Sequence, residues 1–426
     1  MTMAGGAPAG AGMGDGHALD ARVRFLTEYA RRLHNAGVSS QRLEGAIRAT
    51  ARALRLECEA WSTPTGLLLS LTDTDALLGS QQTRVLRLEP GHVDLGALAA
   101  LDRIGEEVLA GRLDIDGAWT AMRALDRPMT RARRLRTIAA FGVASTAVAG
   151  LLGTSWLDLA VACVLGLCIG WISVRSGEHP DLDAANEAVS ALVATTLATL
   201  FGHFVAPIAV QTVVVSALIV LMPGLMLTTA MTELATQQLS SGSARAAGAL
   251  TVLLKLTFGS IAATQVLGAI GWTVPTPAPS TLPVAVEWVA AVLAAASFAT
   301  LFQAARRDVP LVMASALAGY VITRVTGAWF ADGSAVFAGG VFFASLAMAA
   351  LANLYGRWSG RPGSLVRLPG IMLLVPGSVG FRALGMVMAR DYTMGLETLI
   401  AVLSALLALT AGLLFGALLV PPRRHL

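Results

Sequence analysis

Charge is scarce in this sequence and unevenly distributed. Charged residues make up 14% of the 426 positions, whereas an ordinary soluble domain carries about 25%. Residues 1–134 hold more than half of them, and the rest of the chain holds the others in short clusters between long apolar runs. Repeated apolar runs of about 20 residues leave no surface for water. The sequence therefore excludes a soluble two-domain protein and indicates a membrane protein with a soluble N-terminal part.

Cysteine and lysine are also rare. The three cysteines, Cys58, Cys163 and Cys168, are too few and too scattered to form a disulfide scaffold. The only lysine, Lys255, follows a leucine, so the Gly-Lys-Ser/Thr core of a nucleotide-binding loop is missing and the chain cannot be the ATPase of a pump. The HExxH and GxSxG motifs of metalloproteases and serine hydrolases are missing too. We expect no enzymatic activity, no cofactor and no bound metal.

The basic residues define a membrane topology and not a polyanion site. Although the formal net charge is +4, the arginines lie at the ends of apolar segments, so we expect no nucleic-acid partner. Alternate connections carry the arginines, at positions 127–136, 175, 245, 306–307, 357–367 and 423–424. On the opposite side only Arg390 breaks the pattern. By the positive-inside rule, we expect a multi-pass protein of the cytoplasmic (inner) membrane with both termini in the cytoplasm.

The first 134 residues predict a short tail and a small α+β domain. Residues 1–17 lack the apolar core of a signal peptide and are rich in glycine and alanine, which predicts a flexible tail. Within residues 18–134, helical spacing of apolar residues gives way to strand patterns and returns. The expected helices are 19–33, 43–54, 95–108 and 115–125, and the expected strands are 56–60, 66–71 and 84–88. We expect this domain to be cytoplasmic.

Ten apolar runs follow, and we expect each to be a transmembrane helix. They cover residues 135–152, 156–174, 188–204, 207–230, 246–271, 283–304, 309–329, 334–354, 367–389 and 395–420. A proline-rich linker, 273–283, separates a first half, 135–272, from a second half, 284–426. Because five is an odd number of spans, two similar halves must lie upside down relative to each other, as in many secondary transporters. The expected fold is an all-α polytopic membrane protein with ten transmembrane helices in two inverted five-helix halves, preceded by a small α+β cytoplasmic domain.

A Pro-Gly pair interrupts the fourth span of each half. Pro223-Gly224 and Pro376-Gly377 each remove a backbone donor and allow the helix to break. A broken helix presents the N-terminus of its second part, with free N–H groups and the positive end of the helix dipole, to the interior of the bundle. A single pair is typical of a packing kink. Two pairs at matching positions indicate a substrate site.

Polar side chains follow both breaks and complete the expected site. Thr228 and Thr229 follow the first break, and Ser378 and Arg382 follow the second. We hypothesise that the carboxylate of a zwitterionic substrate lies at the two helix N-termini and that these hydroxyls contact the substrate's own hydroxyl. The alternative is a pair of kinks that serve packing alone.

Ionisable residues inside the apolar runs are candidates for coupling and gating. Charge within a membrane is costly and is usually functional or paired. We expect Glu233, after the first break, and Lys255, in the fifth span, to form a protonation-linked pair, and Glu187, at the start of the third span, to act as a gate. A structural pair between Lys255 and either glutamate, or a helix-capping role for Glu187, is the alternative.

Three stretches of the sequence resemble the threonine/serine exporter family. They read LHNAGVSSQRLEGAIRATARAL near the N-terminus, LMPGLMLTTAMTELATQQLSSGSARAAG in the middle and LPGIMLLVPGSVGFRALG near the C-terminus. The family's motif positions fall on Pro223, Gly224, Glu233, Gly242, Arg245, Pro369, Gly370, Pro376, Gly377, Ser378 and Arg382. The resemblance covers most of residues 20–420 and implies ten spans joined to a cytoplasmic N-terminal region. It assigns no role to any single residue.

The resemblance implies export of threonine or serine from the cytoplasm, driven by the proton gradient. Relatives whose two halves are separate proteins are associated with dicarboxylate export, so a succinate-like substrate is the alternative within transport. The implied partners are a small amino acid or dicarboxylate and the lipid bilayer, and a homo-oligomer is left open. From another class, the N-terminal domain would be an enzyme or a sensor, although ten spans exceed what an anchor needs.

Overall fold

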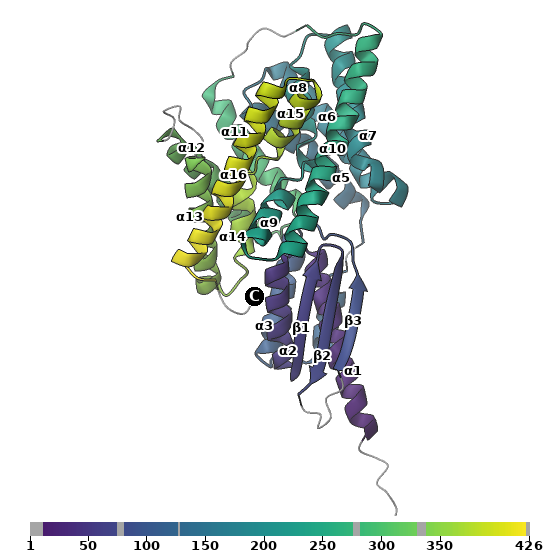
Figure 1. Ribbon diagram of the computed structural model, residues 1–426, viewed down its shortest axis with the longest axis vertical. Coiled ribbons are helices and arrows are strands. Elements are labelled where there is room, and N and C mark those ends of the chain that lie inside the picture. The colour runs from purple at the N-terminus through teal and green to yellow at the C-terminus, as the bar shows by residue number, and fades with distance from the viewer. Residues whose placement is uncertain (1–11, 75–80, 127, 276–281, 330–337, 423–426) are drawn as a thin grey trace, which may run out of the picture. The chain divides into compact units, whose positions relative to one another are not determined.

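The computed structural model describes residues 12–74, 81–126, 128–275, 282–329 and 338–422. The chain divides into two compact units, which we call the N-terminal unit, up to Arg127, and the membrane unit, Pro128–Pro422. Most of the described residues are helical, and a small three-stranded sheet lies in the N-terminal unit (Figure 1). The predicted combination of a helical membrane part and a small α+β part is confirmed at this level.

The helices and strands of the N-terminal unit follow the order that the sequence predicted. They are α1 (Gly12–Asn35), α2 (Ser40–Ala53), β1 (Leu56–Thr63), β2 (Gly66–Asp73), β3 (Gln81–Arg87), α3 (Leu95–Leu109) and α4 (Ile115–Arg123). The strands form an antiparallel sheet in the order β1-β2-β3. Helix α1 begins at Gly12, so the expected tail was wrong for residues 12–17, while residues 1–11 lie outside the described part. Three glycines in that stretch hid the helix, because glycine disfavours helical conformation.

One face of β1 and β2 is buried beneath helices, and β3 is largely exposed. In β1, Leu56, Cys58 and Ala60 are buried, and the residues between them are exposed. This period of two places every second side chain on the same face. Helix α2 packs against β1, and α1 packs against β2. The core therefore lies between this face and the helices.

The membrane unit consists entirely of helices in its described residues. They are α5 (Arg131–Leu151), α6 (Trp156–Ser176), α7 (Pro180–Phe204), α8 (Val210–Ala217), the short 3₁₀ helix η1 (Ile219–Leu221), α9 (Gly224–Ala235), α10 (Leu239–Ala269), α11 (Val284–Leu301), α12 (Val309–Ala328), α13 (Gly339–Ser359), α14 (Ser364–Met372), α15 (Gly377–Met388) and α16 (Tyr392–Leu419).

Eight helical segments among the described residues are long and apolar enough to cross a membrane. They are α6, α7, α10, α11, α12, α13, the run from α14 through α15, and α16. The run from α8 through α9 makes a ninth if it is counted as one span despite a bend of 53°. Helix α5, the first of the ten expected spans, is not among them, and four of its first six residues are arginines. Length and composition therefore support a multi-pass membrane protein with eight or nine spans.

Small residues allow the long helices of the membrane unit to pack closely. Helix α7 packs against α10, and α13 packs against α16. A Cβ atom on Gly259 of α10 would lie 2.2 Å from the carbonyl oxygen of Ala188, and one on Gly412 of α16 would lie 2.4 Å from that of Phe342. Glycine at such positions lets helix backbones approach. Large apolar side chains such as Trp171 and Phe258 remain more than half exposed, as expected of a surface that meets lipid.

Candidate functional site

Both Pro-Gly pairs break their helices in the same way. Helices α9 and α15 begin at Gly224 and Gly377, and the proline before each has almost the same backbone conformation, φ −81° and ψ 42° at Pro223 and φ −82° and ψ 35° at Pro376. Proline cannot donate the hydrogen bond that would continue the preceding helix. The breaks that the sequence predicted are therefore present at both positions.

The two breaks lie against each other. A Cβ atom on Gly377 would lie 3.2 Å from the Cα of Gly224, and one on Gly224 would lie 2.6 Å from Cγ1 of Val375. Only glycine has no side chain to place in these gaps. In Figure 1, α9 and α14 lie toward one end of the membrane unit, and α8 and α15 lie toward the other. The two broken helices thus run in opposite directions past a common crossing, which we call the Pro-Gly crossing (residues 222–226 and 375–379).

The Pro-Gly crossing presents unpaired backbone donors. The N–H groups of Gly224 and Gly377 bond the carbonyls two residues before them, at 2.8 and 3.0 Å. The next two N–H groups in each helix, those of Leu225, Met226, Ser378 and Val379, have no hydrogen-bond partner within the described part of the chain. Free N–H groups and the helix dipole both favour an anion at a helix N-terminus. The crossing can therefore accept a carboxylate from two helices at once.

The hydroxyls near the starts of α9 and α15 differ in which hydrogen bonds they can make with a ligand. Thr228 and Thr229 donate to the carbonyls of Gly224 and Leu225, at 3.2 and 2.9 Å. Their hydrogens are occupied within α9, so they can only accept a bond from a ligand. The half-buried Ser378 has no hydrogen-bond partner among the described residues and can donate or accept.

Arg382 supplies a positive charge one turn beyond Ser378. The two residues are four apart on α15 and therefore lie on the same face of the helix. Arg382 is half-buried, and its Nε is fully buried without a hydrogen-bond partner in the described structure. A buried donor without a partner is costly, and a carboxylate is the natural acceptor for a guanidinium. Arg382 and the N-terminus of α15 together fit a carboxylate.

The predicted pair between Glu233 and Lys255 is wrong. Glu233 is buried at 2% exposure near the end of α9 and accepts hydrogen bonds from Arg245 Nε at 3.0 Å and Ser241 Oγ at 2.9 Å. The reason is local, because the short turn between α9 and α10 brings the start of α10 back against the end of α9. We gave Arg245 no role from the sequence and did not name Ser241. A chain turn predicted at residues 236–238 would have placed both residues near Glu233.

Lys255 instead pairs with Glu187. Its Nζ lies 3.2 Å from the Glu187 carboxylate and 2.9 Å from the carbonyl oxygen of Ala184. Lys255 lies on α10 and Glu187 lies on α7, and these two helices pack against each other. Both side chains are partly exposed, at 35% and 21%. The structure therefore favours the structural alternative for this pair.

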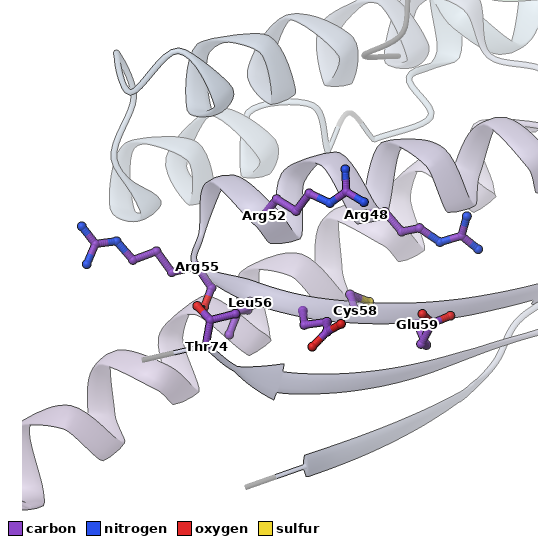
Figure 2. Close-up of a pocket in the computed structure, with 8 residues that line it drawn as sticks. Arg48, Arg52, Arg55, Leu56, Cys58, Glu59 and Thr74 are labelled. Atoms are coloured by element: carbon purple, nitrogen blue, oxygen red, sulfur yellow. The ribbon is translucent and has the colours of Figure 1, made fainter. Parts of the chain in front are cut away.

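A recess lies on the N-terminal unit alone. It has a volume of about 490 Å³ and is lined by Arg48, Arg52, Arg55, Leu56, Glu57, Cys58, Glu59 and Thr74. Figure 2 shows Arg48 and Arg52 extending from α2 and Arg55 pointing away from both. Burial raises the pKa of the Cys58 thiol to about 11, so at neutral pH this thiol is not a nucleophile. Nothing in this recess supports an enzymatic site.

Family comparisons match nearly the whole length of both units. A protein-family model described as "Putative threonine/serine exporter" matches residues 24–267, and a second model, described as "Threonine/Serine exporter, ThrE", matches residues 287–419. The first match alone spans more than half of the chain and includes α9, and the second includes α15.

Two curated relatives are fungal proteins, one of them named as a membrane protein. The chain is 25% identical over 375 residues to a pheromone-regulated membrane protein of Debaryomyces hansenii, with 84% of this chain and 36% of that protein covered. It is 24% identical over 378 residues to an uncharacterised protein of Schizosaccharomyces pombe, with 84% and 48% covered. The chain thus spans between a third and a half of the length of these relatives. No solved structure matches it.

Proposed function

From the premise that the chain belongs to the threonine/serine exporter family, we propose that it is a secondary transporter that exports threonine and serine from the cytoplasm. Membership supports a membrane transporter, and the choice of substrate rests on the Pro-Gly crossing. The observation that carries it is the meeting of two helix N-termini whose four N–H groups have no partner in the described part of the chain, with Arg382 in the second turn of one of these helices.

We propose ten spans in two inverted halves, α5 to α10 and α11 to α16. The packing partners repeat in support, because α9 packs against α10 as α15 packs against α16, and α7 packs against α10 as α13 packs against α16. Helix α5 packs against α11, the first helix of the other half. The opposite directions of the broken helices in Figure 1 are what inversion requires. This count includes α5 and treats each broken helix as one span.

The substrate carboxylate occupies the Pro-Gly crossing in this proposal. The N–H groups that follow Gly224 and Gly377 and the guanidinium of Arg382 bind it, and the prolines Pro223 and Pro376 keep those groups unpaired. Ser378 donates to the substrate hydroxyl, while Thr228 and Thr229 accept from the ammonium group. One arginine near the start of α15 suits one carboxylate, which favours an amino acid over a dicarboxylate.

The arginine distribution supports an orientation in the cytoplasmic membrane with both ends of the membrane unit on the cytoplasmic side. The turn between α9 and α10 then faces the cytoplasm, and the turn between α15 and α16 faces the outside. The Pro-Gly crossing lies between them, where alternating access needs a substrate site.

The test is counterflow in proteoliposomes with labelled threonine, serine, alanine and succinate. We expect exchange of threonine and serine but not of succinate. Arg382→Gln lowers exchange by about 10- to 100-fold or more, because a charged hydrogen bond contributes about 1.5–3 kcal/mol. Arg390→Gln is the matched control, since Arg390 is exposed and its backbone φ of 67° is close to the 64° of Gln237. Exchange of succinate, or full activity in Arg382→Gln, would contradict the proposal.

A further inference from the structure

The hairpins that follow the two breaks have the same backbone. Helices α9 and α15 are each 12 residues long. The turns that follow contain a non-glycine residue with positive φ at the same place, Gln237 at 64° and Arg390 at 67°. A Cβ atom on Gly242 would lie 2.9 Å from the backbone nitrogen of Leu234, and one on Gly395 would lie 2.9 Å from that of Val387.

These matches place the two hairpins in register. Each position of the second hairpin follows its counterpart in the first by one constant separation along the chain. In this register Glu233 corresponds to Met386, and Arg245 corresponds to Thr398. The two hairpins can therefore be compared side chain by side chain.

Equivalent positions hold an ion pair in the first hairpin and an uncharged pair in the second. In the first hairpin, Glu233 and Arg245 are bonded at 3.0 Å, with side-chain exposures of 2% and 10%. In the second hairpin, the Thr398 hydroxyl lies 3.8 Å from the sulfur of Met386. The second hairpin thus shows that this turn between two helices can form with an uncharged pair in place of the ion pair.

A buried ion pair is a poor way to stabilise such a turn. Removing two charges from water costs several kcal/mol per ion, and apolar replacements of similar volume are often neutral or stabilising. Charges inside a membrane are rare and commonly mark ion or proton pathways. Since the second hairpin closes without charge, the ion pair of the first hairpin needs a reason other than stability.

We propose that Glu233 is the proton-coupling residue of the transporter and that its bond to Arg245 fastens the α9–α10 hairpin until a proton arrives. This inference rests on the proposed function and deepens it. Coupling then belongs to one half of the membrane unit, and the α15–α16 hairpin takes no part in it.

The proton balance follows from the pair. When the Glu233 carboxylate takes up a proton from the outer side, it becomes neutral, while Arg245 keeps its charge. A buried cation without a counter-ion is unfavourable, so the hairpin loosens. Release of the same proton to the cytoplasmic side restores the bond. One acid moves one proton inward for each substrate molecule exported.

Arg245 is the charged group that responds when Glu233 is protonated. Helices α10, α15 and α16 pack against α9. Their charged residues are Arg245 and Lys255 on α10, Arg382 on α15 and Glu397 on α16. Lys255 is bonded to Glu187, and Glu397 is exposed. Arg245 bonds Glu233 directly, as does the uncharged Ser241.

The experiment transplants the neutral pair of the second hairpin into the first. Glu233→Met with Arg245→Thr is compared with the wild type in proteoliposomes for two quantities, threonine counterflow and threonine accumulation driven by a pH gradient. For one-to-one exchange, the wild type reaches about a tenfold concentration ratio per pH unit. The double variant keeps counterflow within about threefold and loses accumulation, so that its ratio falls to one.

Two further measurements keep the inference open to refutation if the double variant does not fold. Glu233→Gln retains an acceptor for Ser241 and Arg245 but carries no proton, and a pH dye inside the vesicles should record no proton movement on addition of threonine. The control is Lys255→Met with Glu187→Gln, which removes a different ion pair. This variant should keep threonine accumulation coupled to the pH gradient. Accumulation that persists in Glu233→Gln overturns the inference, as does loss of counterflow in a folded variant. Absence of threonine and serine counterflow in the wild type overturns the proposed function instead.

Discussion

Helices α9 and α15 enter the Pro-Gly crossing with the same backbone and different chemistry. Each begins at a glycine, follows a proline of matching conformation and leaves two N–H groups unpaired within the described structure. In α9 the next turn carries Thr228 and Thr229, whose hydroxyl hydrogens are already bonded. In α15 it carries Ser378 and Arg382, whose hydroxyl and Nε have no such partner.

The comparison separates what the repeated backbone supplies from what the side chains add. The backbone supplies two helix N-termini, which attract an anion whatever the sequence. The side chains differ in the role that we propose for them: α15 carries groups that can bind a substrate, and α9 carries a buried acid that can bind a proton. Changes to the shared backbone should therefore affect transport more than the loss of a single hydroxyl, and changes to pairs outside both sites should affect it least.

The largest effect in this series is expected from a methyl group at the crossing. Gly377→Ala places a Cβ 3.2 Å from the Gly224 backbone, and overpacking of this kind costs about 1–3 kcal/mol. We expect counterflow to fall by about tenfold or more, with a lower melting temperature. The measurement is initial-rate counterflow beside a thermal shift of the purified protein.

The matched control for this change lies in the same helix. A Cβ on Gly385 of α15 would meet no atom within 4 Å, and replacement of glycine by alanine within a helix stabilises by up to about 1 kcal/mol. Gly385→Ala should keep its transport and melt at the same temperature or slightly higher. If Gly377→Ala behaved in the same way, close approach at the crossing would not matter.

A smaller effect is expected when a hydroxyl is removed, and we expect it on α15 but not on α9. Ser378→Ala removes a hydroxyl that is free to donate, and we expect the preference for threonine over alanine to drop by about five- to tenfold, as for one hydrogen bond. Thr229→Val removes a hydroxyl that is already bonded to Leu225 and should change the preference by less than about twofold. Competition counterflow measures both ratios. Equal losses in the two variants would remove the asymmetry between α9 and α15.

Local patterns predicted the elements and the breaks. Alternation at Leu56, Cys58 and Ala60 predicted β1, and proline followed by glycine predicted both interruptions, because these signals depend on neighbouring residues alone. Helix α5 was harder to assess, since arginines at its start lower its apolar character over part of a span. The N-terminus of α1 was missed because its glycines argue against a helix.

Contacts between helices were beyond such patterns. The sequence placed Glu233 and Lys255 in adjacent spans, but it did not give the tight turn that brings Arg245 to Glu233 or the packing of α7 along α10. The back-bonding of Thr228 and Thr229 was foreseeable, because a threonine inside a helix commonly donates to the carbonyl four residues earlier. The free Nε of Arg382 was not, since it depends on which helices surround it.

The smallest effect is expected from the ion pair between α7 and α10. Lys255 and Glu187 lie 3.2 Å apart but remain partly exposed, and exposed pairs contribute about 0–1 kcal/mol. Lys255→Met with Glu187→Gln should therefore change counterflow by less than about twofold and leave the melting temperature nearly unchanged. The same proteoliposome and thermal-shift assays measure it. A large loss of transport here, equal to that of Gly377→Ala, would mean that the contact between α7 and α10 moves during transport and that function is not confined to α9 and α15.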